Sequence, residues 1–234
     1  MSKESQSTSE QYYKLSPQEI ARDINETFCE AEPKSIKILD VDFLVCPHVY
    51  PSQRFRSTHA MLEAILLHTQ NKKICEIGCG CGTLGQVALV KGAKELVQGD
   101  INPYAVKNAL ENKKLHRFSD QQLRVFESDC FDNIPSEIFD IIIFAMPYHN
   151  DDIKIVDPLL RAFYDPNFNS IKKFLAQAFK FCHKDTEIFI AFSNKGDTKE
   201  LASIFTKSPF AWELYRQTNK DSAYDNRVYK LKVK

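Results

Sequence analysis

A glycine-rich turn between two apolar segments constrains the fold of this chain more than any other feature. The turn runs from Glu76 to Gly82 with the sequence Glu-Ile-Gly-Cys-Gly-Cys-Gly, overlapping the apolar residues 74–77 and preceding the helix-like residues 84–90. Glycine at such a position lets the backbone pass close to a bound nucleotide, because it has no side chain to obstruct the approach. The sequence therefore predicts a strand, a nucleotide-binding turn and a helix in direct succession.

Apolar runs of strand length alternate with helical stretches through the rest of the chain, which is the pattern of a parallel sheet covered by helices. We expect strands at residues 74–77, 96–99, 123–127, 139–145 and 187–192, and helices at 84–90, 103–112, 171–181 and 197–204. Residues 212–216 and 227–233 alternate as two terminal strands around a polar turn. The predicted fold class is α/β, with a Rossmann-like, seven-stranded, mainly parallel sheet, helices on both faces and an antiparallel last strand.

A small helix and strand extension is expected before this sheet. Ser16 is followed by a proline, and by a glutamate three residues later, which is the sequence of a helix start. Residues 36–45 alternate in part, as a half-buried strand or hairpin does, and Ser57 or Thr58 can cap a further helix. We divide the chain into a disordered tail (1–15), a lid element (16–70) and a main domain (71–234).

Charge, cysteine content and hydropathy exclude several classes of protein. The 31 basic and 31 acidic residues balance, so the chain lacks the overall positive field of proteins that bind long nucleic acids. Seven cysteines without a CxxC pair indicate neither a disulfide framework nor a zinc site. The apolar run 138–146 contains Asp140 and is far shorter than the ~20 residues that cross a bilayer. We therefore expect a cytoplasmic protein with no bound metal and no membrane partner.

Three acidic residues lie at or just after the ends of predicted strands, on the edge where ligands bind in open parallel sheets. Glu76 precedes the first glycine of the turn by two residues and could attract the ammonium group of a cofactor. Asp100 ends the second strand and can accept hydrogen bonds from both ribose hydroxyls. Asp129 follows the third strand and can accept a hydrogen bond from an adenine amine. The set suits an adenosine cofactor bound without a pyrophosphate.

Residues 80–85 also match the dinucleotide pattern Gly-x-Gly-x-x-Gly, so a nicotinamide-dependent oxidoreductase is an alternative. Asp100 lies about twenty residues later, where such enzymes bind the ribose. The two classes differ in the group that would lie beside Glu76. A carboxylate there favours a cationic ligand and repels a pyrophosphate, which favours the adenosine cofactor.

These residues resemble the class I S-adenosylmethionine-dependent methyltransferases, most of all the branch that contains the release-factor glutamine methyltransferases. The resemblance spans residues 45–193 and rests on the approach 47–51, the glycine turn, Asp100-Ile101, Ser128-Asp129 and Met146-Pro147-Tyr148. It implies S-adenosylmethionine as the cofactor and a methyltransferase domain at 71–234. The cofactor contacts that it implies are Glu76, Gly78, Gly80, Gly82, Asp100, Ile101, Ser128, Asp129, Cys130 and Ala145.

The loop after the fourth strand departs from the family pattern. Members of that branch carry Asn-Pro-Pro-Tyr, in which the asparagine side chain and a backbone carbonyl accept hydrogen bonds from the nitrogen that is methylated. This chain has Ala145-Met146-Pro147-Tyr148, and alanine offers no side-chain acceptor. Pro147 can still stiffen the loop and Tyr148 can stack on a flat acceptor. His149, with an ordinary pKa of ~6.5, could act as a general base.

The resemblance also implies residues that close over the cofactor or the acceptor, namely Tyr50, Arg54, Arg56 and Thr58. The expected methyl acceptor is a nitrogen, or an oxygen, of a protein side chain or a small molecule. Because the asparagine is missing, an accessory subunit that binds the cofactor without catalysis is a second alternative. The residues carry no indication of the oligomeric state.

Overall fold

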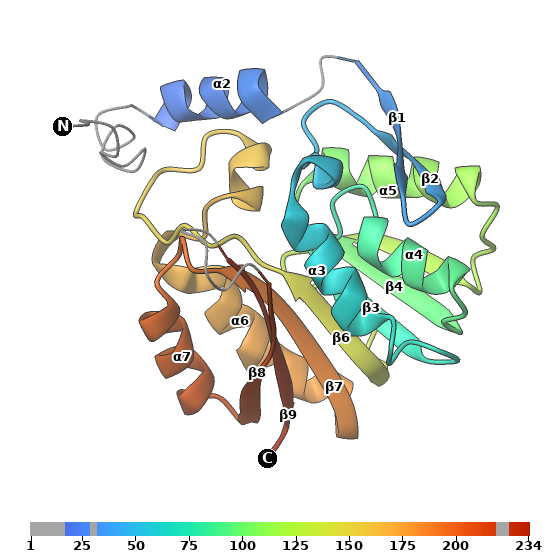
Figure 1. Ribbon diagram of the computed structural model, residues 1–234, viewed down its shortest axis with the longest axis vertical. Helices are drawn as coiled ribbons and strands as arrows, with labels where there is room; N and C mark the ends of the chain where they lie inside the picture. The colour runs from blue at the N-terminus through green and yellow to red at the C-terminus, as the bar shows by residue number, and fades with distance from the viewer. Residues whose placement is uncertain (1–16, 29–31, 219–224) are drawn as a thin grey trace.

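A seven-stranded mixed sheet forms the centre of the computed structural model, which describes residues 17–28, 32–218 and 225–234 (Figure 1). Its strands, in the order β5-β4-β3-β6-β7-β9-β8, are β3 (Lys73–Ile77), β4 (Glu95–Asp100), β5 (Leu123–Glu127), β6 (Phe139–Ala145), β7 (Cys182–Ser193), β8 (Phe210–Thr218) and β9 (Asn226–Val233). Neighbours from β5 to β7 pair in parallel, and β9 is antiparallel to both β7 and β8. The predicted seven-stranded, mainly parallel sheet is confirmed. The predicted tail at 1–15 and the cap at Ser16 lie outside the described residues.

The strand order reverses between β3 and β6, which are neighbours in the sheet although β4 and β5 separate them in the sequence. The chain builds outward from β3 through β4 to β5, and then returns to the other side of β3 as β6. At such a reversal the connections diverge and leave a crevice at the carboxyl ends of the two strands, where ligands bind. The fold therefore places the candidate site at the ends of β3 and β6.

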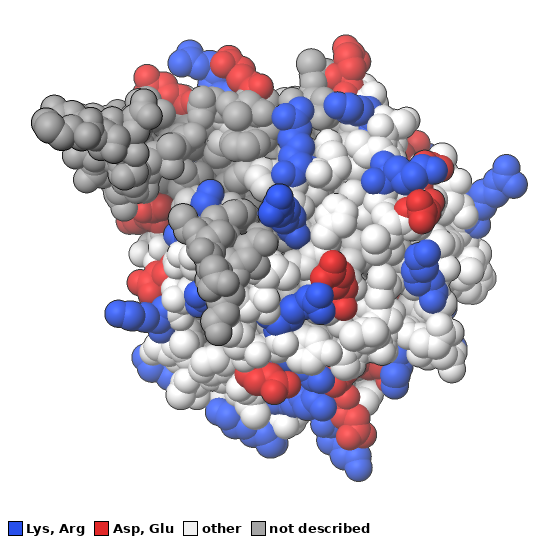
Figure 2. Space-filling view, in the orientation of Figure 1, with Lys and Arg blue, Asp and Glu red and all other residues white. Residues whose placement is uncertain are grey.

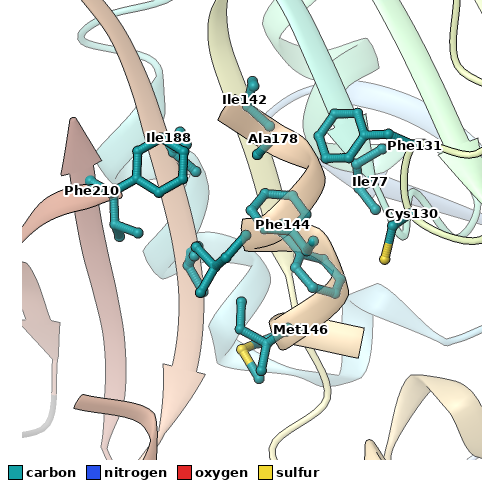
Figure 3. Packing of buried hydrophobic residues seen from close by; sticks show 14 of the residues in the cluster. Ile77, Cys130, Phe131, Ile142, Phe144, Met146, Ala178, Ile188 and Phe210 are labelled. Carbon is teal, nitrogen blue, oxygen red and sulfur yellow. The ribbon is translucent and has the colours of Figure 1, made fainter. Parts of the chain in front are cut away.

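Helices cover both faces of the sheet, as predicted (Figure 1). On one face lie α3 (Arg56–Ile65), α4 (Thr83–Val90) and α5 (Pro103–Leu115), and on the other lie α6 (Asn169–Ala178) and α7 (Thr198–Lys207). Successive side chains of β3 belong to two apolar layers, one on each face of the sheet. In the first layer Ile74 is buried with α3 and α4, and in the second layer Cys75 is buried with Phe174 of α6. Figure 3 shows the second layer, in which Phe144 of β6 and Ile188 of β7 lie next to α6.

Helix α3 belongs to the core, although the sequence prediction grouped it with the lid element at 16–70. Its Met61 and Leu62 are fully buried and pack in one cluster with Ile143 of β6 and Phe189 of β7. α3 therefore covers the sheet directly. A domain boundary at residue 70 therefore separates a core helix from the first strand of the sheet that this helix covers.

A separate two-stranded hairpin, β1 (Lys34–Ile38) and β2 (Val41–Val45), precedes the main sheet. Its two turn residues, Leu39 and Asp40, have positive φ values of 45° and 66°. Two consecutive residues with positive φ are characteristic of the type I′ turn, whose twist matches that of the strands it joins. The partial alternation at 36–45 thus corresponds to parts of two short strands rather than one.

Two asparagines of α5 attach this hairpin to the core. Asn108 Oδ1 accepts a hydrogen bond from Cys46 N at 2.9 Å, and Asn112 Oδ1 accepts one from Leu44 N at 2.8 Å. The amide nitrogens of the same two side chains both donate to Leu44 O, each at 2.8 Å. The asparagines therefore continue the hydrogen bonding of β2 across to a helix, which sequence analysis did not predict.

Residues 147–168, between β6 and α6, form a roof over the carboxyl edge of the sheet, and helix α2 (Pro17–Phe28) lies against it (Figure 1). The roof contains a short 3₁₀ helix, η2 (Pro158–Ala162). Leu159 and Leu160 of η2 are buried in an apolar cluster shared with α2. Apolar contacts with α2 therefore hold the roof in place.

Charged side chains of both signs are interspersed on the face seen in Figure 2, with wide uncharged areas between them. This distribution agrees with the formal net charge of 0. In the described ranges, no helix has both the length and the apolar composition needed to span a bilayer.

Gly85 lets α4 lie close against the sheet. A Cβ at this position would be 2.6 Å from Glu76 Oε2 and 2.7 Å from a methyl group of Leu96. We expect Gly85→Ala to destabilise the protein by about 1–3 kcal/mol, because the added methyl overpacks a rigid site. Urea denaturation of the wild type and the variant measures the difference.

The control for this variant is Ala176→Gly in α6, where the side chain is exposed and only helix propensity changes. That substitution should lower the free energy of unfolding by about 1 kcal/mol, because alanine favours a helix more than glycine does. The same helix propensity would make Gly85→Ala stabilising if packing did not oppose it. A Gly85→Ala protein as stable as the wild type would contradict the packing argument.

Candidate cofactor and acceptor site

A cavity lies at the carboxyl ends of β3, β4 and β6, beneath the roof. The three acidic residues that sequence analysis selected, Glu76, Asp100 and Asp129, all line it. The other predicted cofactor contacts that line the cavity are Gly78, Gly80, Ile101, Ser128, Cys130 and Ala145. Gly82 is the predicted contact that does not line it. The fold therefore brings nearly all of the predicted residues to one space.

The glycines of the turn differ in what surrounds them. Gly78, Gly80 and Gly82 have φ values of 69°, 55° and 90°. A Cβ on Gly82 would lie 2.4 Å from the side chain of Gln86, whereas a Cβ on Gly80 would meet no described atom within 4 Å. Gly82 is thus required by packing inside the protein, which explains why it does not reach the cavity. Gly80 faces open space in which a ligand can lie.

Glu76 is buried at the end of β3, with 2% of its surface exposed. Its Oε2 accepts hydrogen bonds from Gly85 N at 3.0 Å and from Gln98 Nε2 at 2.5 Å. Burial raises the pKa of this carboxyl to about 8, although both hydrogen bonds favour the ionised form. A cation beside Glu76 would favour the carboxylate, so the position suits an ammonium or sulfonium group.

Asp100 joins the glycine turn to the start of α5. Its Oδ2 accepts a hydrogen bond from Gly80 N, and its Oδ1 accepts one from Asn102 N, both at 2.8 Å. Burial raises the pKa of Asp100, and these backbone hydrogen bonds oppose the rise. Each carboxylate oxygen has a second lone pair, so Asp100 can still accept hydrogen bonds from two ribose hydroxyls.

Asp129 takes part in an ion-pair network with α6. Its Oδ2 accepts a hydrogen bond from Lys173 Nζ at 2.7 Å, and the same amine donates to Asp132 Oδ2 at 2.6 Å. These two carboxylates raise the pKa of Lys173 to about 12. The Asp129 side chain is 46% exposed, so it stays accessible to a donor in the cavity.

Ser128 uses its hydroxyl within the turn after β5. The Oγ donates to Cys130 O at 2.9 Å and accepts a hydrogen bond from Asn133 N at 3.0 Å. Cys130 has a φ of 52°, so the backbone turns sharply at this point. Ser128 therefore shapes the turn that presents Asp129, and we expect its contribution to cofactor binding to be indirect.

The loop after β6 lines the other end of the cavity. Ala145, Pro147 and Tyr148 contribute to this lining, together with Ser193 at the end of β7. A Cβ on Gly196 would lie 2.3 Å from the carbonyl oxygen of Tyr148, so this glycine permits close packing of the β7–α7 connection on the loop. Sequence analysis missed Ser193, although a hydroxyl directly after an apolar strand is a signal that could have found it.

His149 does not line the cavity. Its ring lies against those of Tyr148 and Tyr164, with centroid separations of 4.8 and 5.2 Å. Its backbone N donates to Phe163 O at 3.3 Å, and its carbonyl accepts a hydrogen bond from Asp165 N at 2.7 Å. Burial lowers the pKa of the imidazole. His149 thus ties the two ends of the roof together, and this placement gives no support to its predicted role as a general base.

Hydroxyl groups form the wall of the cavity near the start of α4. Ser52 Oγ and Thr83 Oγ1 are 2.9 Å apart, and Thr58 Oγ1 donates to Ser52 O at 3.0 Å. Ser52 and Thr83 are further lining residues that sequence analysis missed. Of the residues expected to close over the site, those that line the cavity are Tyr50 and Thr58, and those that do not are Arg54 and Arg56.

The groups that line the cavity fit S-adenosylmethionine. Its adenine amine, ribose hydroxyls and ammonium group are all donors, and Asp129, Asp100 and Glu76 offer carboxylate acceptors. The open space beside Gly80 is the kind of gap that a closely approaching ligand needs. A pyrophosphate beside the buried carboxyl of Glu76 would instead be repelled once that group ionises.

Comparison with protein families gives a match to the methyltransferase small domain over residues 40–209. A Methanocaldococcus jannaschii protein, provisionally named a protein N5-glutamine methyltransferase, is 44% identical over 100 residues, which are 42% of this chain and 49% of that protein. A ribosomal protein L11 methyltransferase from Bacteroides fragilis is 27% identical over 122 residues, which are 51% of this chain and 41% of that protein. The matched part of the chain thus spans about half the length of these relatives or less.

Solved structures show the same fold at low sequence identity. The T. thermophilus 16S rRNA N2 G1207 methyltransferase, in complex with AdoMet and guanosine, has a TM-score of 0.64 at 15% identity, covering 87% of this chain and 50% of that one. The ribosomal protein L11 methylase of Lactobacillus delbrueckii has a TM-score of 0.55 at 12% identity, covering 76% and 77%.

The family match includes the glycine turn, the three acidic residues and the loop after β6. It overturns the alternative of a nicotinamide-dependent oxidoreductase, because the cofactor of this family is S-adenosylmethionine. The chain belongs to the methyltransferase small domain family of class I S-adenosylmethionine-dependent methyltransferases.

Proposed function

We propose that this chain transfers a methyl group from S-adenosylmethionine to a nitrogen of a protein side chain. The observation that carries the proposal is the convergence of Glu76, Asp100 and Asp129 on one cavity that Pro147 and Tyr148 also line. The carboxylates are the groups that would hold the cofactor, and the loop is the part that would meet the acceptor.

A protein acceptor is favoured over RNA by the relatives with detectable sequence similarity. Both relatives described above are named for the modification of proteins. The structural neighbours that are named as RNA methyltransferases are 15% to 17% identical to this chain and support the fold alone. A net charge of 0 also lacks the general attraction that long nucleic acids exert on basic proteins.

Ser193 is the residue that we assign to the acceptor in place of the missing asparagine. Its Oγ accepts a hydrogen bond from Lys195 N at 3.2 Å, and its hydroxyl hydrogen has no acceptor among the described residues. The register pairs Ala145 of β6 with Ala191 of β7, two residues before Ser193, so the hydroxyl lies at the same edge as the loop. The Ser193 hydroxyl can therefore donate to, or accept from, an amide or amine in the cavity.

The cofactor supplies an electrophilic methyl group, and the protein needs mainly to align the nitrogen with it. Alignment of this kind can lower a barrier by roughly 7–11 kcal/mol in favourable cases. No histidine lines the cavity in the described part of the chain. We therefore propose that the acceptor proton leaves to water rather than to His149.

Transfer of a tritiated methyl group to fractions of a cell extract tests the proposed function. We expect label that protease removes and that ribonuclease leaves in place. Label that ribonuclease removes would contradict the protein acceptor. Cofactor binding without transfer to any fraction would instead support the accessory-subunit alternative.

Tyr148 provides a prediction about the part of the cavity that the loop after β6 lines. Its ring packs edge-on to Phe192, with centroids 6.5 Å apart at 87°. We expect Tyr148→Ala to lower kcat by about 10- to 100-fold while the KM for the cofactor stays within about twofold, because only alignment of the acceptor is lost. Tyr148→Phe keeps the ring and should keep most of the activity. Equal loss of kcat in both variants would show that the hydroxyl, not the ring, is the active group.

A further inference from the structure

Arg161 is the only basic side chain among the described residues that line the cavity. The charged groups on the floor of the cavity are the carboxyls of Glu76, Asp100 and Asp129, so Arg161 is opposite in charge to the rest. The side chain of Arg161 is exposed and makes no ion pair or hydrogen bond with any residue in the described part of the chain. A guanidinium on a cavity wall without a partner among these residues is available for an anionic group of a ligand.

The 3₁₀ helix η2 directs Arg161 toward the cavity. Asp157 starts this helix by accepting a hydrogen bond from Leu159 N at 2.8 Å. Leu159 and Leu160 are 1% and 0% exposed and pack toward α2. Pro158 and Arg161, three residues apart, lie on the side that lines the cavity. The apolar side of η2 therefore anchors it in the roof, and the other side presents the guanidinium.

We propose that Arg161 binds the carboxylate of the methionyl end of S-adenosylmethionine. The proposal rests on the proposed function, because it needs that cofactor in this cavity. The cofactor carries two cationic centres and several donors, which the three carboxylates can serve, and one carboxylate, which they would repel. The planar guanidinium fork matches a carboxylate with two parallel hydrogen bonds. Arg161 is thus the lining group that complements the anionic part of the cofactor.

One consequence concerns the loop after β6. Arg161 belongs to the roof, whereas Glu76, Asp100 and Asp129 belong to strand ends and the turns after them. A cofactor held by both would connect the roof to the floor of the cavity. Bound cofactor should therefore steady the segment that contains Tyr148 before the acceptor arrives.

Calorimetry with two ligands tests this assignment. The ligands are S-adenosylmethionine and its decarboxylated form, which keeps the amine, the sulfonium and the adenosine. We expect the wild type to bind S-adenosylmethionine about 10- to 100-fold more tightly than the decarboxylated form, the range of a charge-assisted hydrogen-bonded pair. Arg161→Met should bind both ligands with the affinity that the wild type has for the decarboxylated form. Arg161→Lys should recover part of the difference.

The matched control is Lys154→Met, which removes an exposed basic side chain of the same roof that does not line the cavity. It should bind both ligands as the wild type does. Equal weakening of both ligands by Arg161→Met would assign Arg161 a structural role and overturn the proposal. Unchanged binding of both ligands with a raised KM for the protein fraction would assign its partner to the acceptor, which also overturns it. Failure of the wild type to bind S-adenosylmethionine would refute the proposed function itself, a separate outcome.

Discussion

Asp100→Ala should raise the Kd for S-adenosylmethionine on the order of 100-fold or more and abolish methyl transfer. The carboxylate accepts hydrogen bonds from Gly80 N and Asn102 N, and it is the group that would bind the ribose. Its removal loses the ribose contacts, each worth about 1.5–3 kcal/mol for a charged acceptor, and frees the glycine turn. Calorimetric titration of the wild type and the variant measures the change.

Two further variants make this test specific. Asp100→Asn keeps an acceptor oxygen for one backbone donor and should bind with an intermediate Kd. Asp120→Ala removes an exposed carboxylate that pairs with Lys113 on the surface, and it should leave the Kd unchanged. An Asp100→Ala protein that is folded by circular dichroism and binds with the wild-type Kd would refute the assignment of this carboxylate to the cofactor.

Glu76→Gln should stabilise the protein at pH 8 while it weakens cofactor binding. The pKa of Glu76 rises from an ordinary value of 4.5 to about 8 in the folded protein. Between these values the folded protein keeps a proton that the unfolded chain has released, so the stability contributed by this group declines as pH rises through that window. The decline is about 3–5 kcal/mol, because each pKa unit corresponds to about 1.4 kcal/mol. Glutamine has no proton to lose and avoids this decline.

Thermal unfolding at several pH values between 5 and 9 measures the effect. The two proteins should have similar Tm values at pH 5, and the variant should exceed the wild type at pH 8 by roughly 10 °C, since about 1 kcal/mol shifts Tm by about 2–4 °C at this chain length. Saturating cofactor should reduce the gap, because a cation beside Glu76 favours its carboxylate. Parallel Tm curves without ligand would show that Glu76 titrates in its ordinary range.

The parallel part of the sheet could be predicted because its strands are short apolar runs bounded by turn signals. The predicted strands at 123–127 and 139–145 agree with β5 and β6 at both ends. Strand β7 begins at Cys182, well before the predicted start at 187, because the polar residues after Cys182 break the apolar pattern. Tertiary pairing extends this strand where local composition does not favour it.

The hairpin turn and the place of α3 could not be predicted for different reasons. Type I′ turns are signalled by glycine and asparagine, whereas Leu39 and Asp40 occupy the turn here. For α3, the apolar spacing of Met61 and Leu62 indicates a buried face but not the element that covers it. Only the completed sheet identifies that partner as β6 and β7.

The acidic residues of the site could be predicted because parallel strands bring their carboxyl ends to one edge, so position in the sequence fixes position in space. The roles of Gly82 and His149 depend instead on contacts with Gln86 and Tyr164 that only the folded chain defines. A glycine in a turn, or a histidine after a strand, has the same local signal whether it faces a ligand or a protein neighbour. Ser193 was missed although its place at the end of an apolar strand is itself a local signal.

The attachment of the roof to α2 joins the cavity to a helix that lies outside the family match. Leu159 and Leu160 meet α2 through apolar contacts that depend on size more than on direction, and such contacts tolerate exchange among similar side chains. α2 ends at Phe28, ahead of the family match, which begins at residue 40. Substitutions in this contact should therefore act on the cavity through the position of the roof, which carries Tyr148 and Arg161, while the carboxylates at the strand ends stay where the sheet places them.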